Sequence, residues 1–554
     1  MTAEADAAIV AAMTPTVLVV ALLSLGAARA GPLLTADQKY KLPDDFLLGA
    51  GTSAIQTEGA WNTDGKGENV FDHYYHSKNA STSESSDVAA DFYGHYKEDI
   101  ALAAKIGLNV FRFSFSWSRI FPDGDTSQPA NSMGVQHYHK VLDEMRNHNI
   151  EPMVTIFHFD YPQALEVKFG GWAGEEMIDV FVEYADFLFK EYGSKIKYWL
   201  TINEPELYCD TLAGGMLAPS TMTTPEKQNA CLKNTILAHA KAHKIYEEKY
   251  KAKYKGLVGV GAGPRFYHGA TNSEEDITAA ENANVNTGIG LTIDPLVFGD
   301  YPEAVRDSRK AFTDEEKDLI KGRIDFVGVN MYGGQNASSS GGGGSDGPPG
   351  DGGSGGGDDQ GPPPGDGGSG DGSGGNRPDS FGDVGSAWVL REMPLWIKKR
   401  YETNGRKLPV FITENGINSP GNTSAVDDWD TRAVYASAFL RELVAGINEN
   451  GTNVIGFTAW SFIDTFEFHS YGNWGMVHVD FNSTGLERTL KNSWTFFKRV
   501  MKTRVVPLVE AGSQPFPDDD STTTTSTTAR TSSSVPLAGS AVLAIAAFLI
   551  AIFI

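Results

Sequence analysis

The amino-acid sequence predicts an α/β protein, a (β/α)8 barrel that forms a single domain. Between about residues 40 and 505, short runs rich in β-branched residues alternate with longer segments in which apolar residues recur at helical spacing. This alternation is typical of parallel strands joined by crossover helices. Eight strand-like runs can be identified, and eight strand and helix units are the number that closes a barrel of this type.

The predicted strands follow one another at fairly regular intervals along the chain. They occupy residues 46–54, 110–117, 151–158, 198–205, 257–263, 324–332, 410–416 and 454–462. Helical spacing of apolar residues is found between them, for example in residues 92–107, 135–149, 177–193, 231–250 and 431–450. Because active sites of such barrels lie at the carboxyl ends of the strands, polar residues there are the first candidates for function.

One segment interrupts the alternation of strands and helices. Residues 338–375 are almost entirely Gly, Ser, Asp and Pro, a composition that cannot bury enough apolar surface to offset the entropy of ordering. We expect a disordered insertion, and because it follows the sixth strand it should leave from the carboxyl-terminal face of the barrel.

The beginning of the chain resembles a targeting signal rather than part of the barrel. An apolar run after Met13 ends in Ala28-Arg29-Ala30, the small-x-small pattern after which signal peptidase cuts. We therefore expect residues 1–30 to be a signal peptide, with a buried helix as the alternative. The residues before Met13 include acidic ones where a signal would be basic, so Met13 is an alternative start.

The end of the chain also lies outside the expected barrel domain, residues 31–507. Residues 508–534 are predicted to form a Ser/Thr-rich stalk, and residues 535–554 are apolar up to the last residue without a cationic stop-transfer residue. This arrangement is typical of a GPI-attachment signal, and a transmembrane anchor is the alternative. The expected location is the secretory pathway and then the extracellular face of the cell membrane, or secretion.

Composition narrows the expected partners. The net charge is -24 and no basic run is present, which argues against binding to nucleic acid or to anionic lipid head groups. Contact with a membrane is expected through the C-terminal anchor only. We expect no metal or nucleotide cofactor, because the sequence has no Cys/His cluster, phosphate-binding glycine loop or His-x-x-x-His pair.

The cysteines and glycosylation signals fit an oxidising compartment. Cys209 and Cys231 are the only cysteines, so either one disulfide or two free, buried thiols would result. Five Asn-x-Ser/Thr sequons are candidate glycosylation sites, at Asn79, Asn336, Asn422, Asn450 and Asn482.

Two glutamates end predicted strands. Glu204 ends the fourth strand in YWLTINEP, and Glu414 ends the seventh in VFITENG. Glycoside hydrolysis requires two carboxyl groups that flank one glycosidic oxygen, and in a barrel both should lie at the carboxyl ends of strands. Either tripeptide alone is weak support, but their joint placement favours a glycosidase.

Several motifs in order give the chain a resemblance to glycoside hydrolase family 1, the β-glucosidase and lactase family. From about Leu42 to Met501 the matching stretches are FLLGAGTSAIQTEGAWNTDGKGENVFD, FRFSFSWSRIFP, TINEPE, DFVGVNMY, FITENG, AWSFIDTFEF and RTLKNSW. The resemblance implies a retaining β-glycosidase that acts on a small β-glycoside, with glucosides, galactosides or fucosides as candidate substrates.

The resemblance also implies roles for individual residues. Glu204 matches the acid/base, Glu414 the nucleophile, and Asn203 the residue that hydrogen-bonds the sugar 2-hydroxyl. Arg112 and Tyr332 match residues that orient the nucleophile. The residues that match the sugar-binding positions are Gln56, His158, Trp460, Glu467 and Phe468, and Tyr332 is counted with them.

These roles have a physical rationale. A neighbouring Arg and a Tyr hydroxyl favour the ionised form that a nucleophilic carboxylate needs, and the nucleophile's negative charge favours the protonated form of the acid. A retaining mechanism predicts a separation of about 5 to 5.5 Å between the two carboxyl groups, and an inverting one roughly 6.5 to 9.5 Å.

The chain departs from the family pattern at two sites. Phe159 and Tyr161 stand where the family has Trp and Leu, and Phe468 stands where it has a Trp whose indole N–H contacts the sugar. Loss of that donor is expected to change the preference between sugars. The segment after Phe468 is short, which predicts an unusual rim on the aglycone side, and retention of Glu467 argues against a sugar phosphate.

Three other functions remain as alternatives. A klotho-like cell-surface receptor would have the same fold but lack a catalytic glutamate, whereas both glutamates are present here. A thioglucosidase of the plant myrosinase type would have Gln in place of Glu204. Transglycosylation would follow if an acceptor sugar, rather than water, intercepted the glycosyl-enzyme.

Overall fold

The computed structural model describes residues 34–77, 84–211, 222–263, 265–339, 384–403, 405–421 and 423–518. The predicted signal peptide, most of the Gly-rich insertion, residues 519–534 of the predicted stalk, the apolar tail and the sequons at Asn79 and Asn422 lie outside these ranges. Described residues up to Phe516 belong to one compact unit, and a second unit, from Pro517, is described only at its first two residues. Within the described ranges, no helix combines the length and apolarity needed to cross a membrane.

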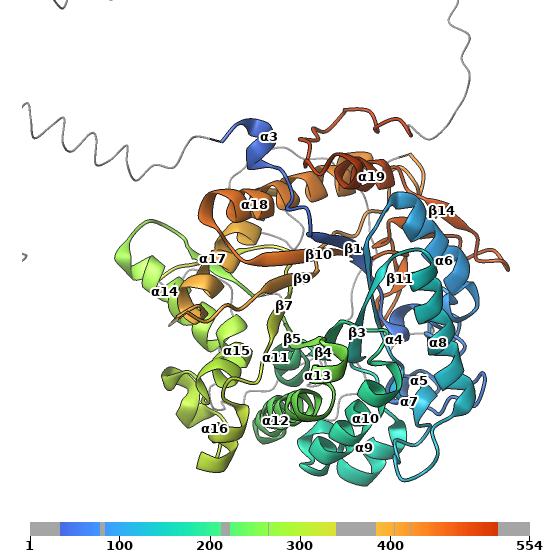
Figure 1. Cartoon of the computed structure of the whole chain (residues 1–554), viewed down its shortest axis with the longest axis vertical. Coiled ribbons are helices and arrows are strands. Elements are labelled where there is room, and N and C mark those ends of the chain that lie inside the picture. The colour runs from blue at the N-terminus through green and yellow to red at the C-terminus, as the bar shows by residue number, and fades with distance from the viewer. Residues whose placement is uncertain are drawn as a thin grey trace, which may run out of the picture. The chain divides into compact units, whose positions relative to one another are not determined.

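Eight parallel strands close into the predicted barrel (Figure 1). Each strand pairs with the next barrel strand along the chain, and the last returns to pair with the first. All eight predicted strands are confirmed, with slightly shorter bounds. They are β1 (Leu47–Gly51), β2 (Val110–Ser114), β3 (Glu151–Phe157), β4 (Tyr198–Asn203), β5 (Leu257–Ala262), β7 (Phe326–Asn330), β9 (Val410–Glu414) and β10 (Val454–Trp460).

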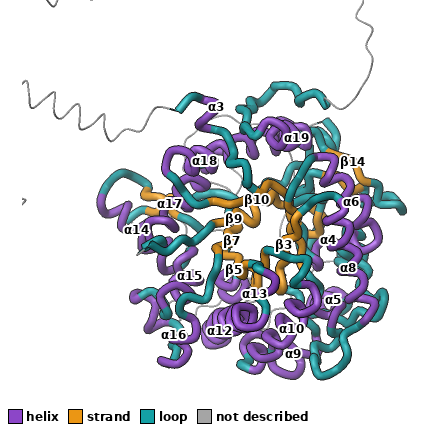
Figure 2. The backbone as a smooth tube through the Cα atoms, viewed as in Figure 1, coloured by secondary structure: helices purple, strands orange, loops and turns teal. Residues whose placement is uncertain are grey.

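Helices surround this ring of strands (Figure 2). Apolar residues at helical spacing form their inner faces; in α8, for example, Tyr138, Val141, Leu142 and Met145 are buried. The five helices predicted between strands are confirmed as α6 (Phe92–Ile106), α8 (Ser132–Asn147), α10 (Glu176–Tyr192), α12 (Pro225–Lys249) and α18 (Val434–Asn450), and the other long helices are α14 (Glu274–Asn286), α15 (Ile289–Phe298), α17 (Val389–Tyr401) and α19 (Trp494–Thr503).

Large apolar side chains fill the amino-terminal part of the barrel interior. They come from the first three residues of their strands and form a cluster separate from the main core: Val110, Met153, Tyr198, Leu200, Phe326 and Phe411. This interior floor excludes solvent from that end of the barrel, so a site inside the barrel can open only at the carboxyl ends of the strands.

The strand pairing is irregular where polar residues end the strands. The register between β4 and β5 shifts between Leu200 and Asn203, and the register between β7 and β9 shifts at Asn330. Irregularities of this kind redirect side chains at the rims of barrels. Asn203 and Asn330 therefore lie where the regular ladder gives way to the site.

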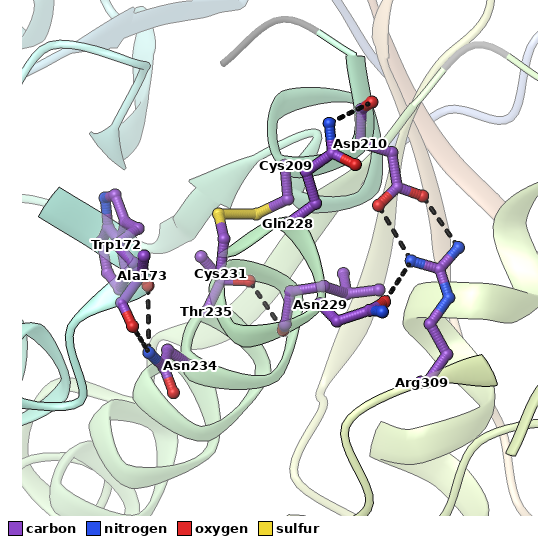
Figure 3. Close-up of a disulfide and its surroundings, with 11 residues drawn as sticks. Trp172, Ala173, Cys209, Asp210, Gln228, Asn229, Cys231, Asn234, Thr235 and Arg309 are labelled. Carbon is purple, nitrogen blue, oxygen red and sulfur yellow. Dashed lines mark hydrogen bonds and ion pairs between the residues drawn. A yellow bond between two sulfur atoms is a disulfide. The ribbon is translucent and has the colours of Figure 1, made fainter. Parts of the chain in front are cut away.

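Two features bind segments outside the strands to the barrel. Cys209, just after β4, forms a disulfide with Cys231 of α12 (Figure 3), so the disulfide alternative is confirmed. Beyond the predicted domain end at residue 507, Val509 is buried and the ring of Phe516 packs edge-on against Trp429.

Candidate active site

Glu204 lies directly after β4 in a backbone conformation that non-glycine residues seldom adopt. Its φ is 44°, in the left-handed region, and its N–H donates to the carbonyl oxygen of Gly261 at 2.7 Å. The carboxyl group accepts a hydrogen bond from Nδ2 of Asn330 at 2.9 Å, and the residue is only 6% exposed. Such conformations persist where surrounding contacts hold them, and they are concentrated at functional sites.

Glu414 is the last residue of β9 and is held by two donors. Nη1 of Arg112 donates to its Oε1 at 2.5 Å, and the hydroxyl of Tyr332 donates to its Oε2 at 2.6 Å. A guanidinium and a hydroxyl donor both favour a negatively charged carboxylate. Both oxygens of Glu414 therefore accept a hydrogen bond, which fixes the orientation of the carboxyl group.

Arg112 and Asn330 extend these contacts into one network. Arg112 also donates to Oδ1 of Asn203 at 2.7 Å and to Oγ1 of Thr155 at 3.1 Å. Asn330 donates to the same Oδ1 of Asn203 at 3.0 Å and accepts from the hydroxyl of Thr413 at 2.7 Å. Because the amide oxygen of Asn203 already accepts two bonds, its amide nitrogen is the end that is left to donate to a ligand.

The environment of Glu204 favours its protonated form. Burial raises the pKa of Glu204 well above the usual value of 4.5, and the negative charge of Glu414 raises it further. The hydrogen bond from Asn330 and the charge of Arg112 oppose these effects. The two glutamates thus differ as an acid and a nucleophile must: the Glu414 carboxylate is paired with a cation, and the Glu204 carboxyl tends to keep its proton.

Gln56 and Glu467 come from opposite ends of the chain and meet at the site. Nε2 of Gln56 donates to Oε1 of Glu467 at 3.1 Å, and the hydroxyl of Thr465 donates to the same oxygen at 2.5 Å. Ser53 holds the amide oxygen of Gln56 at 2.7 Å. Burial, together with the charge of Glu414, raises the pKa of Glu467 to about 7. This pair presents an amide and a carboxyl group suited to hydroxyl ligands.

His158 and Trp460 form a stacked pair. Their rings are nearly parallel, with an interplanar angle of 6° and centroids 5.8 Å apart. Burial, with a smaller effect from the charge of Arg112, lowers the pKa of His158 well below 6.5, so the imidazole is neutral. Its Nδ1 is buried and has no hydrogen-bond partner among the described residues.

Phe468 lies in an aromatic cluster. The residue is 8% exposed, and its ring packs against Phe71 at 5.3 Å and Phe159 at 6.2 Å between centroids. The hydroxyl of Tyr75 holds its carbonyl oxygen at 2.8 Å. Phe468 thus contributes to an apolar wall.

Trp474 is an aromatic residue of the short segment after Phe468 that the sequence did not single out. Its ring meets the edge of Tyr332 at a centroid distance of 5.9 Å. It is partly exposed, and within the described part of the chain its indole N–H makes no hydrogen bond. A free indole donor therefore stands next to the Tyr that contacts Glu414.

Sequence reasoning also missed Asn330, although the signal was present. In IDFVGVNMY it is the first strongly polar residue after an apolar strand, the same pattern that identified Glu204 and Glu414. Trp474 had no comparable signal, because it follows no strand and its place depends on the path of a loop. Among the described residues, no cluster of His, Cys, Asp and Glu is arranged to hold a metal ion.

The fold and the site together define a glycoside hydrolase. Two buried carboxyl groups in unlike environments end strands at the open end of a (β/α)8 barrel, and amides, a neutral histidine and indole rings accompany them.

Comparisons with known proteins define the family. The model of Glycosyl hydrolase family 1 matches residues 38–506. A cyanidin 3-O-glucoside 7-O-glucosyltransferase (acyl-glucose) from Delphinium grandiflorum is 35% identical over 483 residues, which cover 83% of this chain and 90% of that protein. The chain therefore belongs to glycosyl hydrolase family 1, as the motifs indicated.

Solved structures agree with this assignment. Aphid myrosinase is similar with a TM-score of 0.72 and 29% identity, over 84% of this chain and 100% of that chain. A mutant rice β-glucosidase in a covalent complex with glucose has a TM-score of 0.70 and 30% identity, over 83% of this chain and 99% of that chain. The protein is accordingly a retaining β-glycosidase, an enzyme that acts on O-glycosyl bonds.

Proposed function

We propose that this β-glycosidase hydrolyses terminal β-D-glucosides with Glu414 as the nucleophile and Glu204 as the acid/base. The observation that carries the assignment is the contrast between their partners. Glu414 accepts from Arg112 and Tyr332, whereas burial and the charge of Glu414 favour protonated Glu204.

The proposed reaction has two displacements. In the first, the Glu414 carboxylate attacks the anomeric carbon, the bond to the aglycone oxygen breaks, and Glu204 gives that oxygen its proton. Formation of the ester removes the negative charge of Glu414, which lowers the tendency of Glu204 to hold a proton. Glu204 then takes a proton from water, water attacks the anomeric carbon, and the Glu414 carboxylate leaves.

We assign the sugar-binding roles to side chains with unused donors or acceptors. The free amide nitrogen of Asn203 is placed to bind the sugar 2-hydroxyl, an interaction that strengthens as the anomeric carbon gains positive charge. Gln56 and Glu467 supply a second polar pair, and His158 with Trp460 supplies a neutral imidazole and an aromatic face. The geometry of these residues and their match to the family motifs both support the roles that we assign to them.

Trp474 is our candidate for the donor that the Phe at position 468 cannot provide. The side chain of Phe468 has no N–H donor and packs within an aromatic cluster, whereas the indole N–H of Trp474 has no partner among the described residues. A donor on a different segment would approach the sugar from a different direction. We therefore expect activity on β-galactosides or β-fucosides beside β-glucosides.

Transfer to an acceptor other than water is a second candidate function. The Delphinium relative at 35% identity is named as a glucosyltransferase that uses acyl-glucose. Both reactions share the glycosyl-enzyme and differ only in which hydroxyl attacks it. Thioglycoside cleavage deserves a test as well, because of the likeness to aphid myrosinase.

We also propose that the protein is processed in the secretory pathway. The disulfide between Cys209 and Cys231 and the exposed sequons at Asn336 and Asn482 support an oxidising, glycosylating compartment. The sequence of residues 535–554 supports a GPI anchor or a membrane anchor at the cell surface. Treatment of intact cells with a GPI-specific phospholipase would release a GPI-anchored enzyme and leave a transmembrane form bound.

The function is tested with residues 31–516 expressed in a secretory host and a panel of nitrophenyl β-D-glycosides. We expect turnover of the β-glucoside, loss of that turnover in Glu414→Ala, and retention of the anomeric configuration by NMR. For Glu204→Ala we expect partial recovery with azide and formation of a β-glycosyl azide. A folded wild-type protein that cleaves none of the panel would contradict the proposed substrate class, as would inversion.

A further inference from the structure

Glu206, two residues after Glu204, is a buried carboxylate that the proposed mechanism does not use. It belongs to the short helix α11 (Pro205–Leu207) and is 6% exposed. Its Oε1 accepts the N–H of Gly263 and its Oε2 accepts the hydroxyl of Thr292, each at 2.5 Å. Glu206 thus connects the turn after β4 with the end of β5 and with α15.

We propose that Glu206 is a positioning residue that fixes the turn carrying Glu204 and places a buried carboxylate near this acid. The proposal rests on the acid/base role proposed for Glu204. Glu206 itself has no assigned contact with the substrate.

The geometry explains how Glu206 can fix the turn. The N–H of Glu204 donates to the carbonyl oxygen of Gly261, and the Glu206 carboxylate accepts from Gly263, so two bonds secure the turn to neighbouring residues at the end of β5. A Cβ at Gly263 would lie 3.0 Å from Oε1 of Glu206, which leaves no room for a larger residue without displacement. These contacts hold Glu204 in its left-handed conformation.

Further anchors follow in the same segment, so the turn does not depend on Glu206 alone. Cys209 is joined to Cys231, and Asp210 forms a bidentate ion pair with Arg309 at 2.9 Å for both bonds (Figure 3). The charge of Asp210 is thereby neutralised. A substitution that removes only the charge of Glu206 should leave the segment in place.

The charge of Glu206, in contrast, has no cationic partner. Both of its acceptor contacts come from neutral groups, and among the described residues it forms no ion pair. Arg265 and Glu206 both line one small cavity, but the guanidinium of Arg265 donates to the hydroxyl of Thr211 at 3.5 Å. Burial raises the pKa of Glu206, while the two hydrogen bonds oppose this and favour its ionised form.

Several charged groups act on Glu204. After burial, the charge of Glu414 is the larger cause of the raised pKa of Glu204, and the charge of Glu206 adds to it. Arg112 acts in the opposite direction, and Tyr332 is neutral because burial and both catalytic glutamates raise its pKa. Of the two carboxyl groups that raise the pKa of Glu204, Glu206 is the one that forms no ester in the proposed reaction.

The test compares Glu206→Gln with Glu206→Asp in the protein of residues 31–516. The substrate is phenyl β-D-glucoside, whose poor leaving group requires a proton, and the measurement is kcat/KM against pH. For Glu206→Gln we expect the alkaline limb to move to lower pH by about half a unit or more, with the acidic limb unchanged. Glu206→Asp keeps the charge but shortens the reach, so kcat should fall while the alkaline limb stays.

Dinitrophenyl β-D-glucoside provides the matched control, because its leaving group departs without a proton. Glu206→Gln should leave the first step on this substrate close to wild type, whereas general damage to the site would impair both substrates. An alkaline limb at the wild-type position in folded Glu206→Gln would overturn the inference. Failure of the wild type to cleave either glucoside would instead contradict the proposed function.

A second variant covers the case in which Glu206→Gln does not fold. Thr292→Val removes the donor to Oε2 and keeps the size of the side chain and the charge of Glu206. We expect a several-fold lower kcat with little change in KM for phenyl β-D-glucoside. Unchanged kcat would overturn the positioning role.

Discussion

Nη1 of Arg112 lies 2.5 Å from Oε1 of Glu414, and this ion pair is buried, with exposures of 0% and 5%. Loss of one partner would leave the other as an uncompensated charge, which costs about 3 to 5 kcal/mol in a protein interior. We predict that Arg112→Met lowers the melting temperature and abolishes activity. The double variant Arg112→Met/Glu414→Gln should regain most of the stability without activity, which thermal unfolding and glucoside cleavage can show. If the double variant is no more stable than Arg112→Met, the ion pair does not account for the loss.

A second prediction concerns the hydroxyl of Tyr332. Tyr332→Phe removes its 2.6 Å hydrogen bond to Glu414 and keeps the ring that meets Trp474. Loss of one oriented donor at a reacting group typically lowers kcat about 100-fold or more. Tyr246→Phe is the control, since it removes a buried hydroxyl that accepts from Gly256 at the opposite end of the barrel. Equal losses of kcat in both variants would speak against a specific role of Tyr332.

The raised pKa of Glu467 predicts a pH-dependent stability. Its pKa is about 7 in the folded protein against 4.5 ordinarily, so the folded state binds the proton more tightly. This contribution to stability is complete below pH 4.5 and is lost as the pH rises through 7. Glu467→Gln removes this ionisation. The free energy of unfolding of the variant, relative to that of the wild type, should therefore rise between pH 4.5 and 8, by about 3 kcal/mol at most. Melting temperatures across this range test the prediction, and a constant difference would refute it.

Sugar preference should respond to Trp474. Trp474→Phe keeps an aromatic ring beside Tyr332 but removes the indole N–H, and a hydrogen bond to a neutral group contributes about 0.5 to 1.5 kcal/mol. We expect a change of up to about 10-fold in the ratio of kcat/KM for β-glucoside to β-galactoside. Phe468→Trp tests the opposite change at the position where the family has this residue. If neither variant alters the ratio, the donor lies elsewhere.

The disulfide should stabilise the segment that follows Glu204. Cys209 and Cys231 are 22 residues apart, and cross-linking a loop of that length contributes about 3 kcal/mol. The double substitution Cys209→Ser/Cys231→Ser should therefore lower the melting temperature by several degrees. Activity at low temperature should persist, because Glu206 and the Asp210–Arg309 ion pair still anchor the segment. Complete loss of activity in a folded variant would show that these contacts do not hold the segment in place without the disulfide.

The sequence predicted the barrel closely because each strand has its own local signal. All eight strands appear within the expected ranges, since apolar runs and helical periodicity are properties of neighbouring residues. Glu204 and Glu414 could be found because each is a polar residue at the end of such a run. The same rule applied more strictly would have identified Asn330.

Other parts of the site depend on contacts between distant segments and have no local signal. Gln56 and Glu467 are 411 residues apart in the sequence. Only the resemblance to the family motifs indicated that both belong to the same site. The role of Trp474 depends on the path of a short loop. The role of Glu206 depends on its hydrogen bond with Thr292, which lies in α15, a helix that follows β5. Phe468 was expected as a sugar contact because of its position in a motif, and its packing against Phe71 and Phe159 could not be inferred from spacing.

The floor of large side chains at the amino-terminal end makes the barrel a socket with one opening. A glycan chain cannot thread through such a socket, and a terminal sugar can enter the barrel interior from the open end only. The departing aglycone, the incoming water and the released sugar must all use the same passage, and they must do so in turn. Water and any other hydroxyl compound can therefore reach the glycosyl-enzyme only after the aglycone has left.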